Sequence, residues 1–132
     1  MFDDNYKQWT TKLDQVYPVN PKNFDGVADN TQMMWLHDPS LLHNIRVRYN
    51  KNEIYTYTAY ILISVNPYKS IPSLYEDDMI WKYYQSSIGS LPPHCFGIAS
   101  RAYRMMKSSG KNQSIVVSGE SGAGKTETCK VN

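Results

Sequence analysis

The sequence has few cysteines, almost no net charge and no long apolar run. Its two cysteines, Cys95 and Cys129, lie far apart and lack C-x-x-C spacing, which indicates a reducing compartment and neither a zinc site nor a disulfide framework. A net charge of +2 gives no reason to expect binding to nucleic acid or to an anionic membrane. Residues 1–20 lack the apolar stretch of a signal peptide, and no run approaches the ~18 apolar residues of a membrane span. We therefore expect a cytoplasmic protein.

The composition is that of a soluble globular chain. Hydrophobic residues make up 41% and charged residues 20% of the 132 residues, enough for one modest domain with its own core. Eleven tyrosines and three tryptophans indicate large packing surfaces, either within the chain or against another body.

Residues 1–25 are polar with scattered aromatic side chains. We expect an N-terminal arm packed on a larger body, with a short helix over Lys7–Val16. Pro18 and Pro21 then favour an extended linker. Residues 26–132 form the main part of the chain in this interpretation.

A helix of about ten residues is predicted after Asp38, which suits an N-cap and is followed by Pro39 at the first helical position. Apolar residues recur there at helical spacing: Leu41, Leu42, Ile45 and Tyr49. His43 lies beside this stripe, and we expect it to be a half-buried packing residue.

Two strand-like segments follow. Residues 54–57 (IYTY) fit a strand with one face more buried, because β-branched and aromatic residues alternate there. Residues 59–65 are nearly all apolar, which predicts a strand covered on both faces. Asn66-Pro67 ends the run.

Two more helices are predicted before the last strand. Acidic residues 76–78 favour a helix start, with Met79, Ile80, Tyr83 and Tyr84 on its apolar side. Pro92-Pro93 is expected to start the next helix and Gly110 to cap its end. Its apolar positions are Phe96, Ala99, Ala102, Tyr103 and Met106. Residues 113–118 (QSIVVS) then predict a short buried strand.

A phosphate-binding pattern follows this segment directly. Residues 119–126 (GESGAGKT) fit G-x-x-x-x-G-K-[ST]. Glycines let the backbone turn sharply and present amide N–H groups to phosphate oxygens at the start of a helix expected near Gly124. Lys125 would neutralise the β- and γ-phosphates, and the Thr126 hydroxyl would ligate Mg²⁺. The alternative is a flexible glycine turn that binds nothing.

Residues 112–128 (NQSIVVSGESGAGKTET) closely resemble the phosphate loop of the myosin motor domain. Other segments resemble myosin heads in the same order: residues 26–29, 41–49, 54–57, 65–68, 93–96 and 102–106. The resemblance covers roughly residues 24–130, and the sequence LLHNIRVRY is similar to that of class VI unconventional myosins. It implies an α/β fold of the P-loop NTPase type, with a mixed sheet and flanking helices. It also implies that residues 26–132 are the N-terminal part of such a motor domain, ending just after the phosphate loop.

The resemblance also implies binding roles for ATP and Mg²⁺. The matching phosphate-loop positions are Gly119, Glu120, Ser121, Gly122, Ala123, Gly124, Lys125 and Thr126. The positions that match the purine-binding loop are Asn66, Pro67, Tyr68 and Lys69, with Tyr75 beside the adenine. On chemistry alone, an Asn amide can hydrogen-bond a purine edge and a tyrosine ring can cover its face. The residues equally allow Asn66-Pro67 to end a strand and Tyr75 to pack in a core.

Two positions near the loop carry further implied roles. Ser121 resembles the loop serine proposed to relay a proton during hydrolysis, which makes Ser121 and Lys125 the candidate catalytic residues. Glu127 resembles the glutamate that follows the loop, and we interpret it as structural, because its carboxylate can pair with a nearby cation.

Parts of the family pattern are absent from this sequence. Neither N-x-N-S-S-R nor D-x-x-G-F-E, the two switch motifs, occurs here. We therefore expect an ATP-binding piece of an actin-based cytoskeletal motor, inactive alone, whose partners are actin filaments and the rest of the heavy chain. Two alternatives are a short non-enzymatic product that packs against a partner and, less in keeping with the position of the loop, a small phosphate-loop kinase or GTPase.

Overall fold

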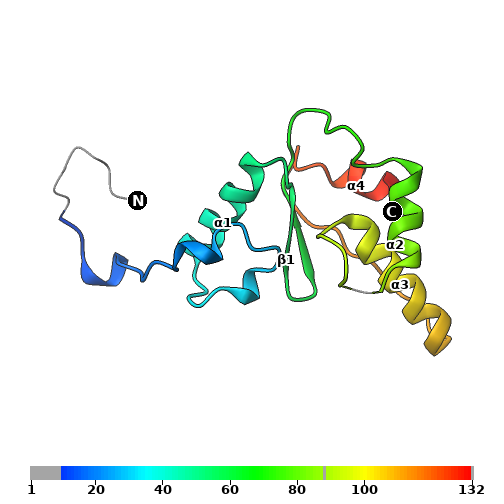
Figure 1. Ribbon diagram of the computed structural model, residues 1–132, viewed down its shortest axis with the longest axis horizontal. Coiled ribbons are helices and arrows are strands. Elements are labelled where there is room, and N and C mark those ends of the chain that lie inside the picture. Colours follow the sequence, from blue (N-terminus) through cyan, green and yellow to red (C-terminus); the bar gives the residue numbers. More distant parts are fainter. Residues whose placement is uncertain (1–9, 88, 132) are drawn as a thin grey trace.

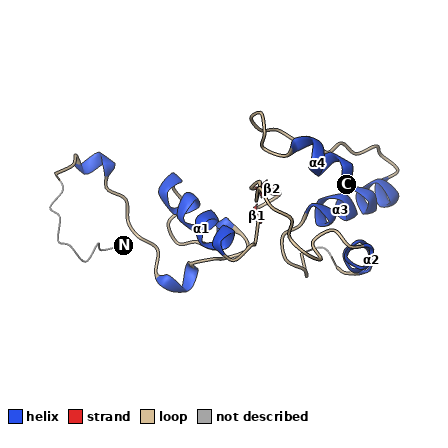
Figure 2. Ribbon diagram, turned by 90° about the horizontal axis from the view of Figure 1, so that it is seen from above, coloured by secondary structure: helices blue, strands red, loops and turns tan. Residues whose placement is uncertain are grey.

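A β-hairpin lies between one helix and a group of three helices in the computed structural model, which describes residues 10–87 and 89–131. Figures 1 and 2 show helix α1 on one side of the hairpin and helices α2, α3 and α4 on the other. The α-helices are α1 (Asp38–Asn50), α2 (Asp77–Gln85), α3 (Cys95–Ser109) and α4 (Lys125–Val131). The strands are β1 (Tyr55–Thr58) and β2 (Ile61–Ser64). Three short 3₁₀ helices precede them: η1 (Leu13–Gln15), η2 (Lys22–Phe24) and η3 (Asn30–Gln32).

The described part of the N-terminal arm contains less helix than the sequence predicts. Residues 7–9 of the predicted helix lie outside the described residues, and the remainder forms only the single 3₁₀ turn η1, which buries no side chain. Without an apolar face against another element, a segment this short does not gain enough from packing to stabilise an α-helix.

Helix α1 buries a polar face instead of an apolar one. Its buried residues are Ser40, Asn44 and Arg48, at four-residue spacing, whereas Leu42 is 69% exposed. The predicted position of His43 is wrong, because its side chain is exposed and contacts Asp25 at 3.1 Å. The predicted N-cap is also wrong by one residue: His37 is the N-cap, and its ring nitrogen accepts a hydrogen bond from the Ser40 N–H.

The apolar run after residue 54 forms two strands, as predicted, and they pair as an antiparallel hairpin. β1 and β2 pair from Tyr55↔Ser64 to Thr58↔Ile61, and the chain turns at Ala59 with φ +54°. On its other edge β1 meets residues 28–29, where the Tyr57 N–H donates to the Ala28 carbonyl. No such bridge covers the outer edge of β2 among the described residues, and Ile61 is 67% exposed. The prediction that residues 59–65 are covered on both faces is therefore wrong.

The apolar core lies where the start of β1 meets helices α2 and α3. Its buried members are Ile54, Tyr55, Tyr83, Cys95 and Phe96. The predicted start of α2 at acidic residues and the predicted Gly110 cap of α3, with φ +67°, are both confirmed. Helix α3 begins at Cys95 rather than at the prolines, because the His94 ring accepts the Phe96 N–H and so marks the N-cap.

Residues 113–118 form no strand, contrary to the prediction. They pass alongside α3 toward the phosphate loop, and Val116 is 88% exposed. A strand requires a hydrogen-bonded neighbour, and none lies beside these residues in the described parts of the chain. Their β-branched composition is not sufficient to form one without a partner.

Candidate functional site

The loop over residues 119–124 has the backbone that a phosphate cradle requires. Gly122 and Gly124 adopt φ +80° and +95°, which strain any L side chain, and the space where each Cβ would lie is open. A Cβ on Gly119 would come within 3.2 Å of the Ala123 Cβ. The three glycines therefore keep the loop tight and its inner side clear.

Lys125 lies at the first position of α4 and folds back over the loop. Its Nζ donates to the carbonyl of Gly119 at 2.9 Å and to that of Glu120 at 2.8 Å. An ammonium has three donors, so these two contacts fix the charge at the loop while the third donor can meet a phosphate oxygen. The Ala123 N–H donates to the Glu120 carbonyl, which closes the turn.

The second predicted segment, residues 66–69, reaches the loop through Asn66. The Asn66 Nδ2 donates to the Gly122 carbonyl at 2.9 Å, and its Oδ1 accepts the Tyr68 N–H at 2.9 Å. Tyr68 has φ +50° and is 83% exposed, and Lys69 is exposed as well. Pro67 is half-buried, and its carbonyl accepts a hydrogen bond from the Tyr49 hydroxyl of α1.

Tyr75 belongs to a different cluster. Its hydroxyl lies 2.8 Å from the Tyr55 hydroxyl, and its ring packs near His94 and Phe96. Burial raises the pKa of Tyr55, and it raises the pKa of the Cys95 thiol in the same cluster. Burial also lowers the pKa of His94. The cluster is therefore held neutral, and the Cys95 thiol is not an activated nucleophile.

The remaining predicted site residues are exposed at the loop and at the start of α4. Glu120, Ser121, Thr126 and Glu127 all present their side chains to solvent. Glu127 forms an ion pair with Lys130 at 2.8 Å on the exposed face of the helix. Thr126 and Ser121 make no side-chain hydrogen bond to any described residue, so both hydroxyls are available to a ligand.

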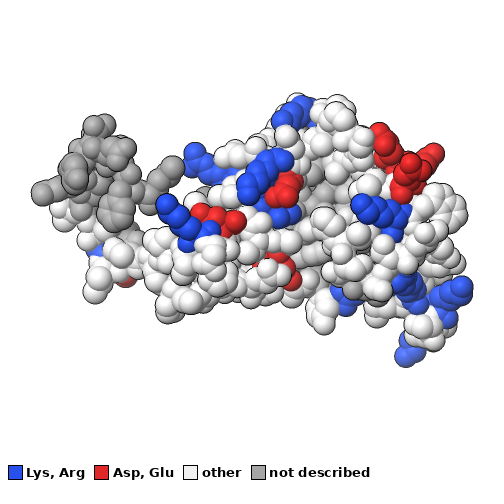
Figure 3. Space-filling view, viewed as in Figure 1, with Lys and Arg blue, Asp and Glu red and all other residues white. Residues whose placement is uncertain are grey.

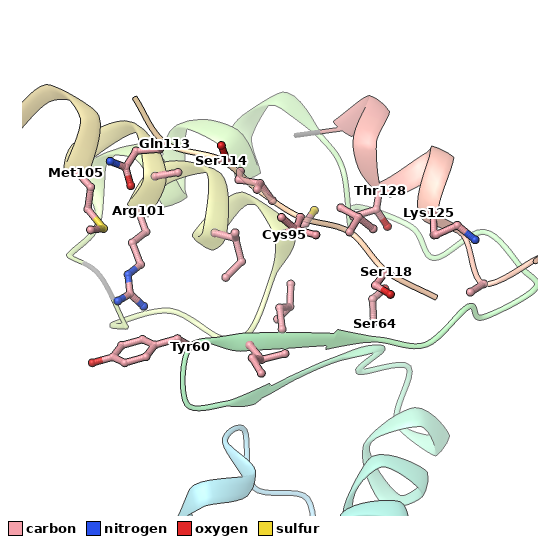
Figure 4. A pocket seen from close by; sticks show the side chains of 18 residues that line it. Tyr60, Ser64, Cys95, Arg101, Met105, Gln113, Ser114, Ser118, Lys125 and Thr128 are labelled. Atoms are coloured by element: carbon pink, nitrogen blue, oxygen red, sulfur yellow. The ribbon is translucent and has the colours of Figure 1, made fainter. Parts of the chain in front are cut away.

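A groove of about 540 Å³ runs from the phosphate loop between β2 and residues 113–118. Figure 4 shows Lys125, Ser64 and Ser118 at one end, with Arg101 and Tyr60 at the other. The Arg101 guanidinium carbon lies 4.2 Å from the centre of the Tyr60 ring. The groove thus separates the outer edge of β2 from the segment whose sequence predicts a strand.

Sequence reasoning missed the polar contacts that hold α1 on β1, whose hairpin partner β2 leads toward Asn66. The Arg48 guanidinium donates to the carbonyls of Tyr55 and Gly26 and to the Thr56 hydroxyl, and it contacts Glu53 at 3.3 Å. Asn44 links Gly26 and Asn30 in the same region. The polar residues at positions 40, 44 and 48 share one helical face, and that spacing is the signal that identifies them.

Charge is distributed unevenly over the surface. Between residues 79 and 119 the sequence contains cations but no acidic residue, and Figure 3 shows lysine and arginine side chains gathered around the free end of α3. No group of three or more His, Cys, Asp or Glu side chains that could hold a metal ion occurs in residues 10–87 and 89–131.

Within residues 10–87 and 89–131, every helix is too short or too polar to cross a membrane.

Comparison with known proteins identifies the family. The sequence model of the myosin head (motor domain) family matches residues 27–131. The chain is 51% identical over 124 residues to unconventional myosin-VI of Bos taurus, and this match covers 94% of the chain and 10% of that protein. It is 48% identical over 128 residues to Myosin-11 of Arabidopsis thaliana, covering 96% of the chain and 8% of that protein.

These matches span only about a tenth of the length of the curated relatives. Class VI and plant myosins match at similar identity. The family model alone covers most of the chain, so the chain belongs to the myosin head (motor domain) family.

Proposed function

We propose that residues 119–126 bind the phosphates of ATP within an actin-based motor. The observation that supports this most strongly is the position of the Lys125 ammonium, which two loop carbonyls hold over the open glycine turn. A cation held in place beside an open glycine turn suits a polyphosphate, because the charge then needs little rearrangement on binding. Thr126 would ligate Mg²⁺, which would supply positive charge beside the bound phosphates.

The purine side of the site is proposed to comprise residues 66–69 and Tyr75. The hydrogen bond from Asn66 to Gly122 supports this, because it places the segment directly beside the phosphate loop. The exposed Tyr68 and Lys69 border the same side. Tyr75 is 44% exposed, which leaves part of its ring available to cover a base.

We also propose that the hairpin and residues 113–118 belong to one mixed sheet of the P-loop NTPase type. The free edge of β2, the groove of about 540 Å³ and the strand-forming composition of residues 113–118 all support a further strand between them. Residues 26–132 would then be the N-terminal part of the motor domain, with residues 1–25 as an arm.

Within that motor, Lys125 would stabilise the phosphates and the Ser121 hydroxyl would pass a proton beside the γ-phosphate. Ser121 is exposed at the turn of the loop, where a hydroxyl can reach a bound phosphate. The complete protein would couple hydrolysis to movement on actin filaments, together with the rest of the heavy chain, in the cytoplasmic cytoskeleton.

The test is to measure binding of a fluorescent ATP analogue and actin-activated phosphate release by the complete polypeptide that the gene encodes. We expect Mg²⁺-dependent ATP binding and an increase in phosphate release when actin filaments are added. Binding of ATP without any response to actin would contradict the motor function, and the absence of ATP binding would contradict the proposed site.

A further inference from the structure

The side-chain amide of Asn66 is already engaged at both ends by the chain itself. One N–H of Nδ2 donates to the Gly122 carbonyl, and Oδ1 accepts the Tyr68 N–H, both at 2.9 Å. An amide that recognises a purine edge uses a donor and an acceptor side by side in one plane. In Asn66 the acceptor Oδ1 and one of the two Nδ2 hydrogens are directed to protein backbone instead.

The contact to Gly122 ties the phosphate loop to the rest of the molecule. Within the described residues, the other hydrogen bonds of residues 119–124 stay inside residues 119–128. Asn66 itself is anchored, because the Tyr49 hydroxyl of α1 lies 3.5 Å from the Asn66 carbonyl and 3.4 Å from that of Pro67. A chain of contacts therefore runs from α1 through Asn66 to the loop.

Gly122 is a position where such a contact has a large effect. It has φ +80°, no side chain, and open space around its Cα. Glycine loses more conformational freedom on ordering than any other residue. A hydrogen bond to its carbonyl reduces the freedom that a phosphate would otherwise have to remove on binding.

We propose that Asn66 is a positioning residue that holds Gly122 and thereby preorganises the phosphate loop, and that its amide does not select the purine. This inference rests on the proposed function, because it concerns the same ATP site. Contact with the base is then made by the other residues of the segment. The contribution of Asn66 to affinity is the same for every polyphosphate ligand, with or without a base.

Two substitutions separate the contacts of Asn66. Asn66→Asp keeps the Oδ1 acceptor for Tyr68 but loses the donor to Gly122, whereas Asn66→Ala loses both. Asn52→Asp is the matched control, because Asn52 is an exposed asparagine in the turn after α1 and has no contact with the loop. All variants are made in the complete natural polypeptide.

The first measurement compares the affinities for Mg²⁺-ATP and for Mg²⁺-tripolyphosphate, which has no base. We expect Asn66→Ala to weaken both by the same factor of about five, the size of one net hydrogen bond. A loss for ATP with unchanged tripolyphosphate affinity would show that Asn66 selects the purine and would overturn the inference. Unchanged affinity for both ligands would overturn it as well.

The second measurement is amide hydrogen exchange at residues 122–125 without nucleotide, which avoids repulsion between the new carboxylate and phosphate. We expect faster exchange in both Asn66 variants and none of this change in Asn52→Asp. Equal exchange in all variants would refute the contact between Asn66 and the loop. If the unsubstituted protein binds neither ligand, the proposed function fails, and the exchange result alone decides whether Asn66 positions the loop.

Discussion

Two regions of the described chain are stabilised in different ways. The region around α1 and β1 is held by buried polar contacts from its own residues, chiefly Arg48 and Asn44, which are 5% and 1% exposed. Among the described side chains, the region from residue 113 to α4 buries none, and apolar residues of this region line a groove. The first region therefore supplies the hydrogen-bond partners of its own buried groups. The second region has a loop of defined geometry beside a strand-like segment that pairs with no strand among the described residues.

A large loss of stability is expected from a substitution at Arg48. Arg48→Ala would leave the carbonyls of Tyr55 and Gly26 without this donor, at a cost of roughly 3 kcal/mol in the free energy of unfolding. Arg46→Ala on the exposed side of the same helix is the control and should change it by less than about 0.5 kcal/mol. Urea unfolding of the 132-residue chain measures both. Equal losses would contradict the role given to the polar face of α1.

A pair of apolar truncations compares the two regions directly. Ile54→Ala removes a side chain that is 4% exposed and should cost about 2–4 kcal/mol. Val116→Ala, where the side chain is 88% exposed, should cost less than about 0.5 kcal/mol in the same chain.

The same pair in the complete polypeptide tests the proposed sheet. If a further strand pairs beside residues 113–118, Val116→Ala should become measurably destabilising there. A negligible cost of Val116→Ala in both contexts would count against that strand, and thermal unfolding provides the comparison.

A smaller effect is expected from acid at His94. Its Nδ1 accepts the Phe96 N–H and its Nε2 lies 2.9 Å from the Leu74 carbonyl, so the folded state holds the neutral ring. The groups that face it are Tyr55, Tyr75, Tyr83 and Cys95, with burial lowering the pKa of His94. The unfolded chain therefore binds more protons below about pH 6.5, and stability falls as the pH decreases through that value.

The variant His94→Asn keeps an N-cap acceptor but cannot be protonated. It should lose less stability than the unsubstituted chain between pH 7 and pH 5, where the slope is at most about 1.4 kcal/mol per pH unit for one proton. His43→Asn, at an exposed position, is the control. A His94→Asn variant with an unchanged pH profile would show that His94 is not responsible for the acid sensitivity.

Local sequence signals predicted the elements whose partners are near in the chain. The acidic start of α2 and the Gly110 cap depend on contacts within one turn of the helix. The polar face of α1 was missed because Leu41, Leu42 and Ile45 suggested an apolar face, although the partners of Arg48 are backbone groups that only the fold brings near it. Composition could not decide whether residues 113–118 form a strand, because a strand forms only where a neighbouring strand pairs with it.

In the candidate site, too, local features were predictable from the sequence and long-range contacts were not. The glycine pattern of residues 119–126 predicted a tight loop followed by a helix, and α4 does begin at Lys125. The hydrogen bond between Asn66 and Gly122 joins residues 56 positions apart, which no local pattern reveals. The roles of these residues in binding ATP stay predictions.

The central claim is that Lys125 holds the phosphates of ATP, and a matched pair of lysine variants tests it most directly. Lys125→Ala and Lys130→Ala remove the same charge from one helix, but Nζ of Lys130 pairs with Glu127 at the exposed surface, not with the loop. Titration of the complete polypeptide with labelled ATP should show a loss of roughly 10- to 100-fold in affinity for Lys125→Ala, the size of one charged hydrogen bond, and little change for Lys130→Ala. Equal affinities in the two variants would contradict the account.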